Sequence, residues 1–158
     1  MRAEIYSHHS GSQRRSLNYE TDYLAWIEAT VTQLRDRNYE AVDWANLIEE
    51  IEDMGKRERR SLESNLVVLL LHLLKWQFQP ERRSGSWQGS IVEHRRRVVR
   101  SLKDSPSLKS YLEQIFADCY RAAVEQASAE TQLPESAFPP DSPYTIEQIL
   151  TPKFLPES

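Results

Sequence analysis

Residues 62–78 are apolar almost all the way round at helical spacing, and this segment constrains the fold more than any other part of the chain. A helix of that kind must be covered on most sides by other elements. Its uninterrupted apolar stretch, residues 66–71, is far shorter than the roughly 20 apolar residues that a bilayer span needs. We therefore predict a central helix that is buried by protein, in a chain that makes no membrane contact.

The composition favours further helices around that segment. A chain of 158 residues fits one domain, its 4 glycines are few for a turn-rich sheet protein, and 28% of its residues are charged. No alternating apolar and polar run bounded by turn residues indicates a strand. We predict an all-α fold in which residues 19–158 form a single-domain helical bundle of four main helices around the central buried helix. Residues 1–18 lack periodicity and are expected to form a flexible N-terminal arm.

Apolar positions at helical spacing predict where the other helices lie. Two are expected before the central helix, at residues 21–38 and 43–54, and two after it, at residues 87–103 and from residue 108 onward. The first two carry apolar stripes that we expect to face the core: Tyr23, Leu24, Ile27, Val31 and Leu34, then Leu47, Ile48, Ile51 and Met54. A break or kink is expected at Gly55, with one continuous helix as the alternative.

The C-terminal part combines a loop with a short helix. Four of the 8 prolines fall within residues 133–144, which excludes regular structure there. Thr145 and Gln148 have the spacing of a capping box, in which each side chain bonds the backbone of the other residue. We therefore predict a short C-terminal helix that ends at Leu150, after a Pro-rich loop.

The net charge of -4 hides a segregated pattern. Residues 20–54 hold ten acidic and two basic residues, residues 55–103 hold twelve basic and four acidic residues, and residues 104–158 hold nine acidic and three basic residues. In one interpretation the acidic helices pack beside the basic middle and neutralise it within the fold. In the other, the basic middle is free for nucleic acid or an acidic partner.

Cysteine usage and the N-terminal sequence bear on the compartment. With Cys119 alone, an internal disulfide and a Cys-based zinc site are both excluded. The N-terminus has no apolar segment followed by a small-residue cleavage site, so no secretory signal is expected. A reducing cytoplasm is the predicted location.

Arg95 is the most informative single residue, because it points out of the middle of an apolar stripe. It lies three or four residues from Ile91, Val92, Val98 and Val99. A guanidinium in that position keeps its charge and needs a carboxylate or a fork of carbonyl groups. Residues 49–53 are the richest supply of carboxylates. Arg95 is therefore either a structural ion pair between helices or an anion-holding group in a cleft.

A line of polar residues runs along the central helix at seven-residue steps: Glu58, Asn65, His72 and Gln79. This line can face solvent or a groove beside the bundle. Alternatively, Asn65 and His72 can hydrogen-bond across the core and set the register of the helices, or the line can border a ligand crevice. His72 on its own is expected to be a structural histidine.

Carboxylates on the second expected helix raise the question of a metal site. Glu49 and Glu52, and Glu49 and Asp53, share helix faces as in bundles that hold divalent metals. Helical nucleotide pyrophosphohydrolases add a second acidic pair, which this chain lacks, and no Glu-x-x-His of the di-iron pattern occurs. We therefore predict no metal site and no cofactor, and keep a metal-dependent hydrolase as an alternative.

Two basic runs, residues 56–60 and 94–100, are candidates for binding phosphate groups. No recognisable nucleic-acid-binding module or glycine-rich phosphate loop accompanies them, and the pI of 5.6 is acidic. A nucleic-acid binder that uses the basic middle helices is kept as a second alternative.

Several strings in one order resemble a known family. They are LIEEIEDMG from residue 47, HLLKWQFQP from residue 72, SWQGSIVEHR from residue 86, PSL from residue 106 and FPPDSPYTIEQIL from residue 138. Over residues 19–156 the chain is similar to the cyanobacterial domain-of-unknown-function family numbered twenty-nine. The resemblance implies a small all-helical protein without established activity, and it assigns no catalytic residue.

The leading hypothesis is a non-catalytic protein-interaction module that binds a protein partner or a second copy of itself. A full core, oppositely charged segments and the lack of a complete catalytic set motivate it. If the fold brings the conspicuous polar residues together, the candidate cluster is Glu49, Glu52, Asp53, His72 and Arg95. Neither catalytic nor cofactor-binding residues are assigned.

Overall fold

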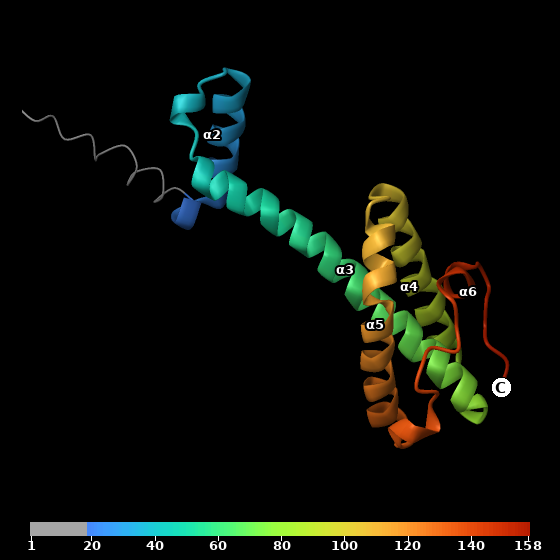
Figure 1. Cartoon of the computed structure of the whole chain (residues 1–158). Coiled ribbons are helices and arrows are strands. Elements are labelled where there is room, and N and C mark those ends of the chain that lie inside the picture. The colour runs from blue at the N-terminus through green and yellow to red at the C-terminus, as the bar shows by residue number, and fades with distance from the viewer. Residues whose placement is uncertain (1–18) are drawn as a thin grey trace, which may run out of the picture. The chain divides into compact units, whose positions relative to one another are not determined.

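A computed structural model describes residues 19–158 of the chain, and its regular elements there are all helices (Figure 1). They are α2 (Tyr23–Arg35), η1 (Tyr39–Ala41), α3 (Trp44–Phe78), η2 (Pro80–Arg82), α4 (Gly85–Asp104), α5 (Leu108–Thr131), η3 (Glu135–Ala137) and α6 (Ile146–Leu150), where η marks a short 3₁₀ helix. The predicted all-α class is confirmed. The predicted N-terminal arm, residues 1–18, lies outside the described residues.

Helix α3 runs without interruption for 35 residues. The predicted break at Gly55 is therefore wrong, and the alternative of one continuous helix is confirmed. A single glycine costs a helix only about 1 kcal/mol, and the flanking Met54 and Lys56 belong to a run of good helix formers. Because neither a proline nor a left-handed residue follows Gly55, nothing ends the helix there.

The contacts of the chain divide it into two compact units, Met1–Gly55 and Lys56–Ser158. The boundary falls within α3, so each unit contains one part of this helix. The single-domain organisation stays a prediction.

The unit from Lys56 onward contains the predicted central helix. The leucines of α3 are almost completely buried there: Leu62, Leu66, Leu69, Leu70, Leu71, Leu73 and Leu74. They form one apolar cluster with Ile91 and Val98 of α4 and with residues of α5 and the C-terminal segment. The burial of the Leu-rich segment by protein is therefore confirmed.

The C-terminal segment packs on the same cluster. Tyr144 donates a hydrogen bond from its hydroxyl to Oε1 of Gln77 at 2.7 Å, and the Phe78 and Phe138 rings meet edge to face with centroids 5.3 Å apart. Ile149 of α6 is fully buried. The capping box of Thr145 and Gln148 that opens α6 is present as predicted.

In the unit that ends at Gly55, residues 19–55 form a helical hairpin made of α2, η1 and the first part of α3. Asp22 caps α2 by accepting a hydrogen bond at Oδ1 from the backbone N–H of Ala25 at 3.0 Å. The chain turns back at Arg37, which has a left-handed φ of 56°. The hydroxyls of Tyr19 and Tyr23 each donate to the carboxylate of Glu50 at 2.7 Å, which ties the start of the hairpin to α3.

Candidate functional site

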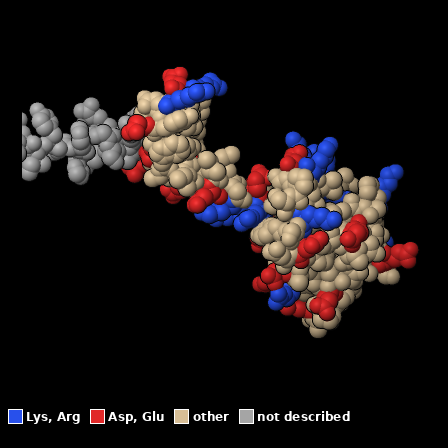
Figure 2. All heavy atoms as spheres, turned by 45° about the horizontal axis from the view of Figure 1, so that its top comes forward, with Lys and Arg blue, Asp and Glu red and all other residues tan. Residues whose placement is uncertain are grey.

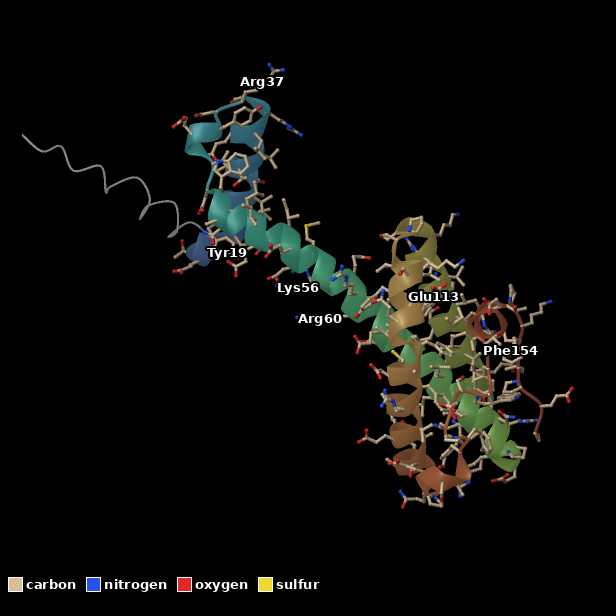
Figure 3. All side chains as sticks on the ribbon, in the orientation of Figure 1. Tyr19, Arg37, Lys56, Arg60, Glu113 and Phe154 are labelled. Carbon is tan, nitrogen blue, oxygen red and sulfur yellow. The ribbon has the colours of Figure 1, made fainter. Side chains whose placement is uncertain are left out.

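Arg95 is buried on α4, and backbone carbonyl groups satisfy it. Its Nε donates to the carbonyl oxygen of Ile149 at 2.7 Å, and one terminal nitrogen donates to that of Phe154 at 2.6 Å. Figure 3 shows Phe154 on the segment that follows α6. The prediction that a fork of carbonyl groups holds Arg95 is confirmed. The prediction that carboxylates of residues 49–53 hold it is wrong. The guanidinium matches one carbonyl group in the last turn of α6 and one in the segment that follows it.

The remaining members of the predicted polar cluster lie in different units. Glu49 and Glu52 are exposed and Asp53 is half-buried on the hairpin part of α3, whereas His72 lies in the other unit with Arg95. Within residues 19–158, no group of three or more His, Cys, Asp or Glu side chains is placed to hold a metal ion. The metal-dependent hydrolase therefore has no ligand set in this part of the chain.

The polar residues of the line along α3 form hydrogen bonds with different partners. The Asn65 side chain accepts a hydrogen bond from Nδ1 of His94 on α4 at 2.9 Å and donates to the Ser61 carbonyl at 2.7 Å. His72 donates from Nδ1 to the carbonyl of Val68 within its own helix at 2.9 Å. The interpretation that this line bonds between helices therefore holds for Asn65 and is wrong for His72.

A buried lysine close to His72 was not singled out as a site residue from the sequence. The ammonium group of Lys75 lies 2.6 Å from Oε2 of Glu130 on α5 and 4.5 Å from the centre of the Trp87 ring on α4. Burial acts to raise the pKa of Glu130, but hydrogen bonds from Lys75 and Gln126 outweigh it and lower the pKa. The only signal in the sequence is a lysine that interrupts an apolar run, because its partners lie far along the chain.

The basic residues on the exposed side of α4 are paired within their own helix. Arg96 and Arg97 lie 2.9 and 2.8 Å from Oε1 of Glu93, and Arg100 lies 3.6 Å from Asp104. Hydrogen bonds from Arg96 and then Arg97 lower the pKa of Glu93 to about 2. These pairs reduce the local positive field that a nucleic acid would meet, although exposed pairs of this kind are weak.

A groove of about 640 Å³ lies between α5 and the Pro-rich loop. Tyr120, Val124, Phe138, Pro139 and Pro140 form its apolar part. The Tyr120 hydroxyl donates to the Pro139 carbonyl at 2.7 Å, and burial is the main cause that raises its pKa to about 12. The tyrosine is therefore engaged and protonated, and it offers the groove no general base at neutral pH.

The hairpin leaves most of its apolar residues in solvent. Only Trp26, Thr30 and Val42 are buried in its described part. The exposed large apolar side chains, which we call the hairpin face, are Tyr23, Leu24, Val31, Tyr39, Trp44, Ile48, Ile51 and Met54. In Figure 2 the visible side of this unit is mostly uncharged, with Asp and Glu at its margins and Lys or Arg across its top.

This exposure corrects a prediction. The stripes that contain Leu24, Val31, Ile48, Ile51 and Met54 were expected to face the core, and all five residues are exposed. The stripes exist at the predicted helical spacing, but the described residues of this unit provide no third α-helix to cover them.

The sequence matches a known protein family. A model of the family described as "Domain of unknown function DUF29" matches residues 18–155, which include every described helix. The chain belongs to the DUF29 family. The resemblance inferred from the sequence is thereby confirmed, whereas the cyanobacterial setting stays a prediction. No curated protein and no solved structure matches this DUF29 chain.

Two further features of this DUF29 chain bear on its function: the apolarity of its helices and the state of its cysteine. Among residues 19–158, no helix has the length and apolarity to cross a bilayer. Cys119 is buried, and this burial is the main cause that raises its pKa to about 11, so the thiol is a poor nucleophile at neutral pH. Of the ten exposed large apolar side chains among the described residues, eight belong to the hairpin face.

Proposed function

We propose that this DUF29 protein is a non-catalytic protein-interaction module that binds its partner with the hairpin face. One observation carries the proposal: the hairpin buries three residues and exposes eight large apolar ones. Soluble proteins rarely keep a large apolar patch open to water unless the patch is an interaction site.

The energetics of a two-helix unit support this function. Helices of this length are marginal in water on their own, and most of their stability comes from packing an apolar face. The small core of the hairpin also contains the indole N–H of Trp26, which has no acceptor among the described residues. A partner that covers the hairpin face would contribute about 25 cal/mol for each Å² of apolar surface removed from water.

The states of the reactive groups support a non-catalytic function. Arg95 is held by two carbonyl groups, and Lys75 is held by Glu130 and Trp87. Cys119 is buried with a raised pKa. In the described part of the chain, these groups stabilise the packing of helices instead of converging on a place where a substrate would react.

A cytoplasmic location is part of the proposal. It rests on the single cysteine of the chain, since a disulfide-free protein of this size is typical of a reducing compartment.

The test compares two matched double variants in which exposed apolar residues become glutamine, a neutral residue that helices accept well. Ile48→Gln/Ile51→Gln alters the hairpin face, and Val92→Gln/Val99→Gln alters two exposed valines of α4. Wild-type protein and the α4 variant are expected to retain the same partner in a pull-down from host lysate. The hairpin variant is expected to lose it.

Sedimentation velocity completes the test. A wild-type chain that sediments as a monomer and captures no protein in a face-dependent way would contradict the proposed function. Partner capture that survives Ile48→Gln/Ile51→Gln would contradict the assignment to the hairpin face.

A further inference from the structure

We propose that the hairpin face binds a cationic amphipathic helix of a partner protein. This inference rests on the proposed function and specifies the chemistry of the partner. It follows from how apolar and acidic residues alternate on the hairpin.

The apolar part of the site is arranged in helical rows. On α3, the residues Trp44, Ile48 and Ile51 are spaced i, i+4 and i+7, and their exposed fractions are 47, 53 and 59%. On α2, Leu24 and Val31 are two turns apart and exposed by 65 and 38%. Rows of this spacing are the receptor surface that an amphipathic helix recognises with its own i, i+3, i+4 and i+7 positions.

Trp44 gives the site a rigid anchor. Its indole N–H donates to the carbonyl of Tyr39 at 3.1 Å, so the polar edge of the ring is satisfied while its apolar faces remain accessible. Tryptophan is enriched among the residues that dominate binding energy at protein interfaces.

Carboxylates border these rows. Exposed Glu28 lies four residues after Leu24 on α2, and exposed Glu52 lies four residues after Ile48 on α3. These positions place an acidic group next to an apolar one on the same side of each helix. A partner helix with an apolar stripe flanked by Lys or Arg would match both the apolar rows and the carboxylates that border them.

Basic residues are few in the described part of the hairpin. Its described part holds ten acidic residues against Arg35 and Arg37, and both arginines lie at the end of α2 where the chain turns. Figure 3 shows Arg37 at the turn, away from Tyr19 at the other end of the hairpin. A cationic partner helix would therefore complement the excess of acidic over basic residues in this part of the chain.

The same charge argues against a second copy as the occupant. Two hairpins with this excess of carboxylates would repel each other, and repulsion would oppose the gain from burying Ile48 and Ile51. A cationic helix would gain both from attraction to the carboxylates and from burial of the apolar residues.

The test uses fluorescence anisotropy with labelled 18-residue peptides made of Leu and Lys. One peptide has Leu on a single helical face, a second has the same composition in an order that spreads Leu around the helix, and a third carries Glu in place of Lys. The full-length protein is expected to bind the first peptide at least tenfold more tightly than the other two. Its affinity should fall with added salt.

Two variants separate the apolar and electrostatic parts of the site. Ile48→Gln/Ile51→Gln is expected to weaken binding at least tenfold and to leave the salt dependence unchanged, whereas Val92→Gln/Val99→Gln is expected to bind as wild type. The double variant Glu28→Gln/Glu52→Gln is expected to reduce the salt dependence. Circular dichroism of each variant checks that the helices are retained.

Three outcomes would overturn the inference. Equal binding of the two Leu/Lys peptides would mean that charge alone attracts them. A hairpin variant that binds the first peptide as wild type does would remove the hairpin face from the interaction. A wild-type dimer that Ile48→Gln/Ile51→Gln dissociates would assign the face to a second copy, and the proposed interaction function would then stand with a different partner.

Discussion

At the scale of single residues, Arg95 shows how a buried charge can fasten one segment of chain to another. Its side chain is held by the carbonyl groups of Ile149 and Phe154, which lie 54 and 59 residues further along. Burial lowers the pKa of Arg95, but a guanidinium stays charged at neutral pH. The charge is therefore stabilised by two backbone carbonyl groups and not by a counter-ion.

Replacement of Arg95 by methionine should destabilise the protein. Arg95→Met keeps much of the side-chain volume but leaves two carbonyl groups without their donors, so we expect a loss of about 2 kcal/mol in the free energy of unfolding. Urea denaturation followed by circular dichroism measures this loss. Arg96→Met on the exposed side of α4 is the control, with an expected change below about 0.5 kcal/mol. Equal changes in both variants would contradict the role of Arg95 as a clamp.

The Lys75–Glu130 pair should make stability depend on pH. The pKa of Glu130 is lower in the folded state than in the unfolded chain, so the pair stabilises the fold at neutral pH. That contribution is lost as the pH falls through the lowered pKa, below the ordinary range of glutamate. In Glu130→Gln, the free energy of unfolding should be smaller at pH 7 and should fall less on acidification from pH 5 to pH 3.

The control for this experiment is Glu125→Gln, an exposed position on the same helix. It should follow the acid dependence of the wild type. A Glu130→Gln profile that runs parallel to wild type across the acidic range would contradict the assignment.

At the scale of elements, the sequence predicts periodicity better than it predicts what covers a helix. The Leu-rich stretch of α3 is apolar on so many sides that burial is its only stable environment, and that prediction is confirmed. The stripe of Ile48 and Ile51 has the spacing of a core face, yet whether another helix covers it depends on contacts between distant parts of the chain. For the same reason, the carboxylate partners predicted for Arg95 were wrong, since the carbonyl groups of Ile149 and Phe154 come from a distant part of the chain and leave no mark in composition.

Gly55 offers a test of the continuous helix. A Cβ atom added at Gly55 would meet nothing within 4 Å, and the same holds at Gly89 in α4. Gly55→Ala should therefore raise the free energy of unfolding by about 0.5–1 kcal/mol, because alanine loses less backbone entropy in a helix. Gly89→Ala should have a similar effect and serves as the matched control. A destabilising Gly55→Ala beside a stabilising Gly89→Ala would indicate that the helix is not continuous at Gly55.

At the scale of the whole molecule, the chain joins a well-packed unit to one with very little core. The unit from Lys56 onward buries a cluster of leucines with the residues of α4, α5 and α6, whereas the hairpin buries three residues. This contrast could not be read from the apolar stripes, which look alike in both units. The family, by contrast, was recognisable from motifs spread over nearly the whole chain.

Amide hydrogen exchange should reveal this contrast directly. Amides of α2 and of α3 before Gly55 should exchange faster than those of residues 62–74, because local opening is easier where few apolar contacts must be broken. Mass spectrometry of peptic fragments after brief labelling measures both regions in one sample. Equal protection in the two regions would mean that the isolated hairpin already has a partner or a hidden core. The matched comparison is α4, whose protection should resemble that of residues 62–74.

The excess of acidic residues on the hairpin affects how the protein behaves in concentrated solution. Repulsion between the acidic residues of different copies keeps their exposed apolar surfaces apart, so these residues stabilise the protein against aggregation. Since dissolved ions shorten the reach of that repulsion, a clear solution at low ionic strength should turn turbid as sodium chloride is added.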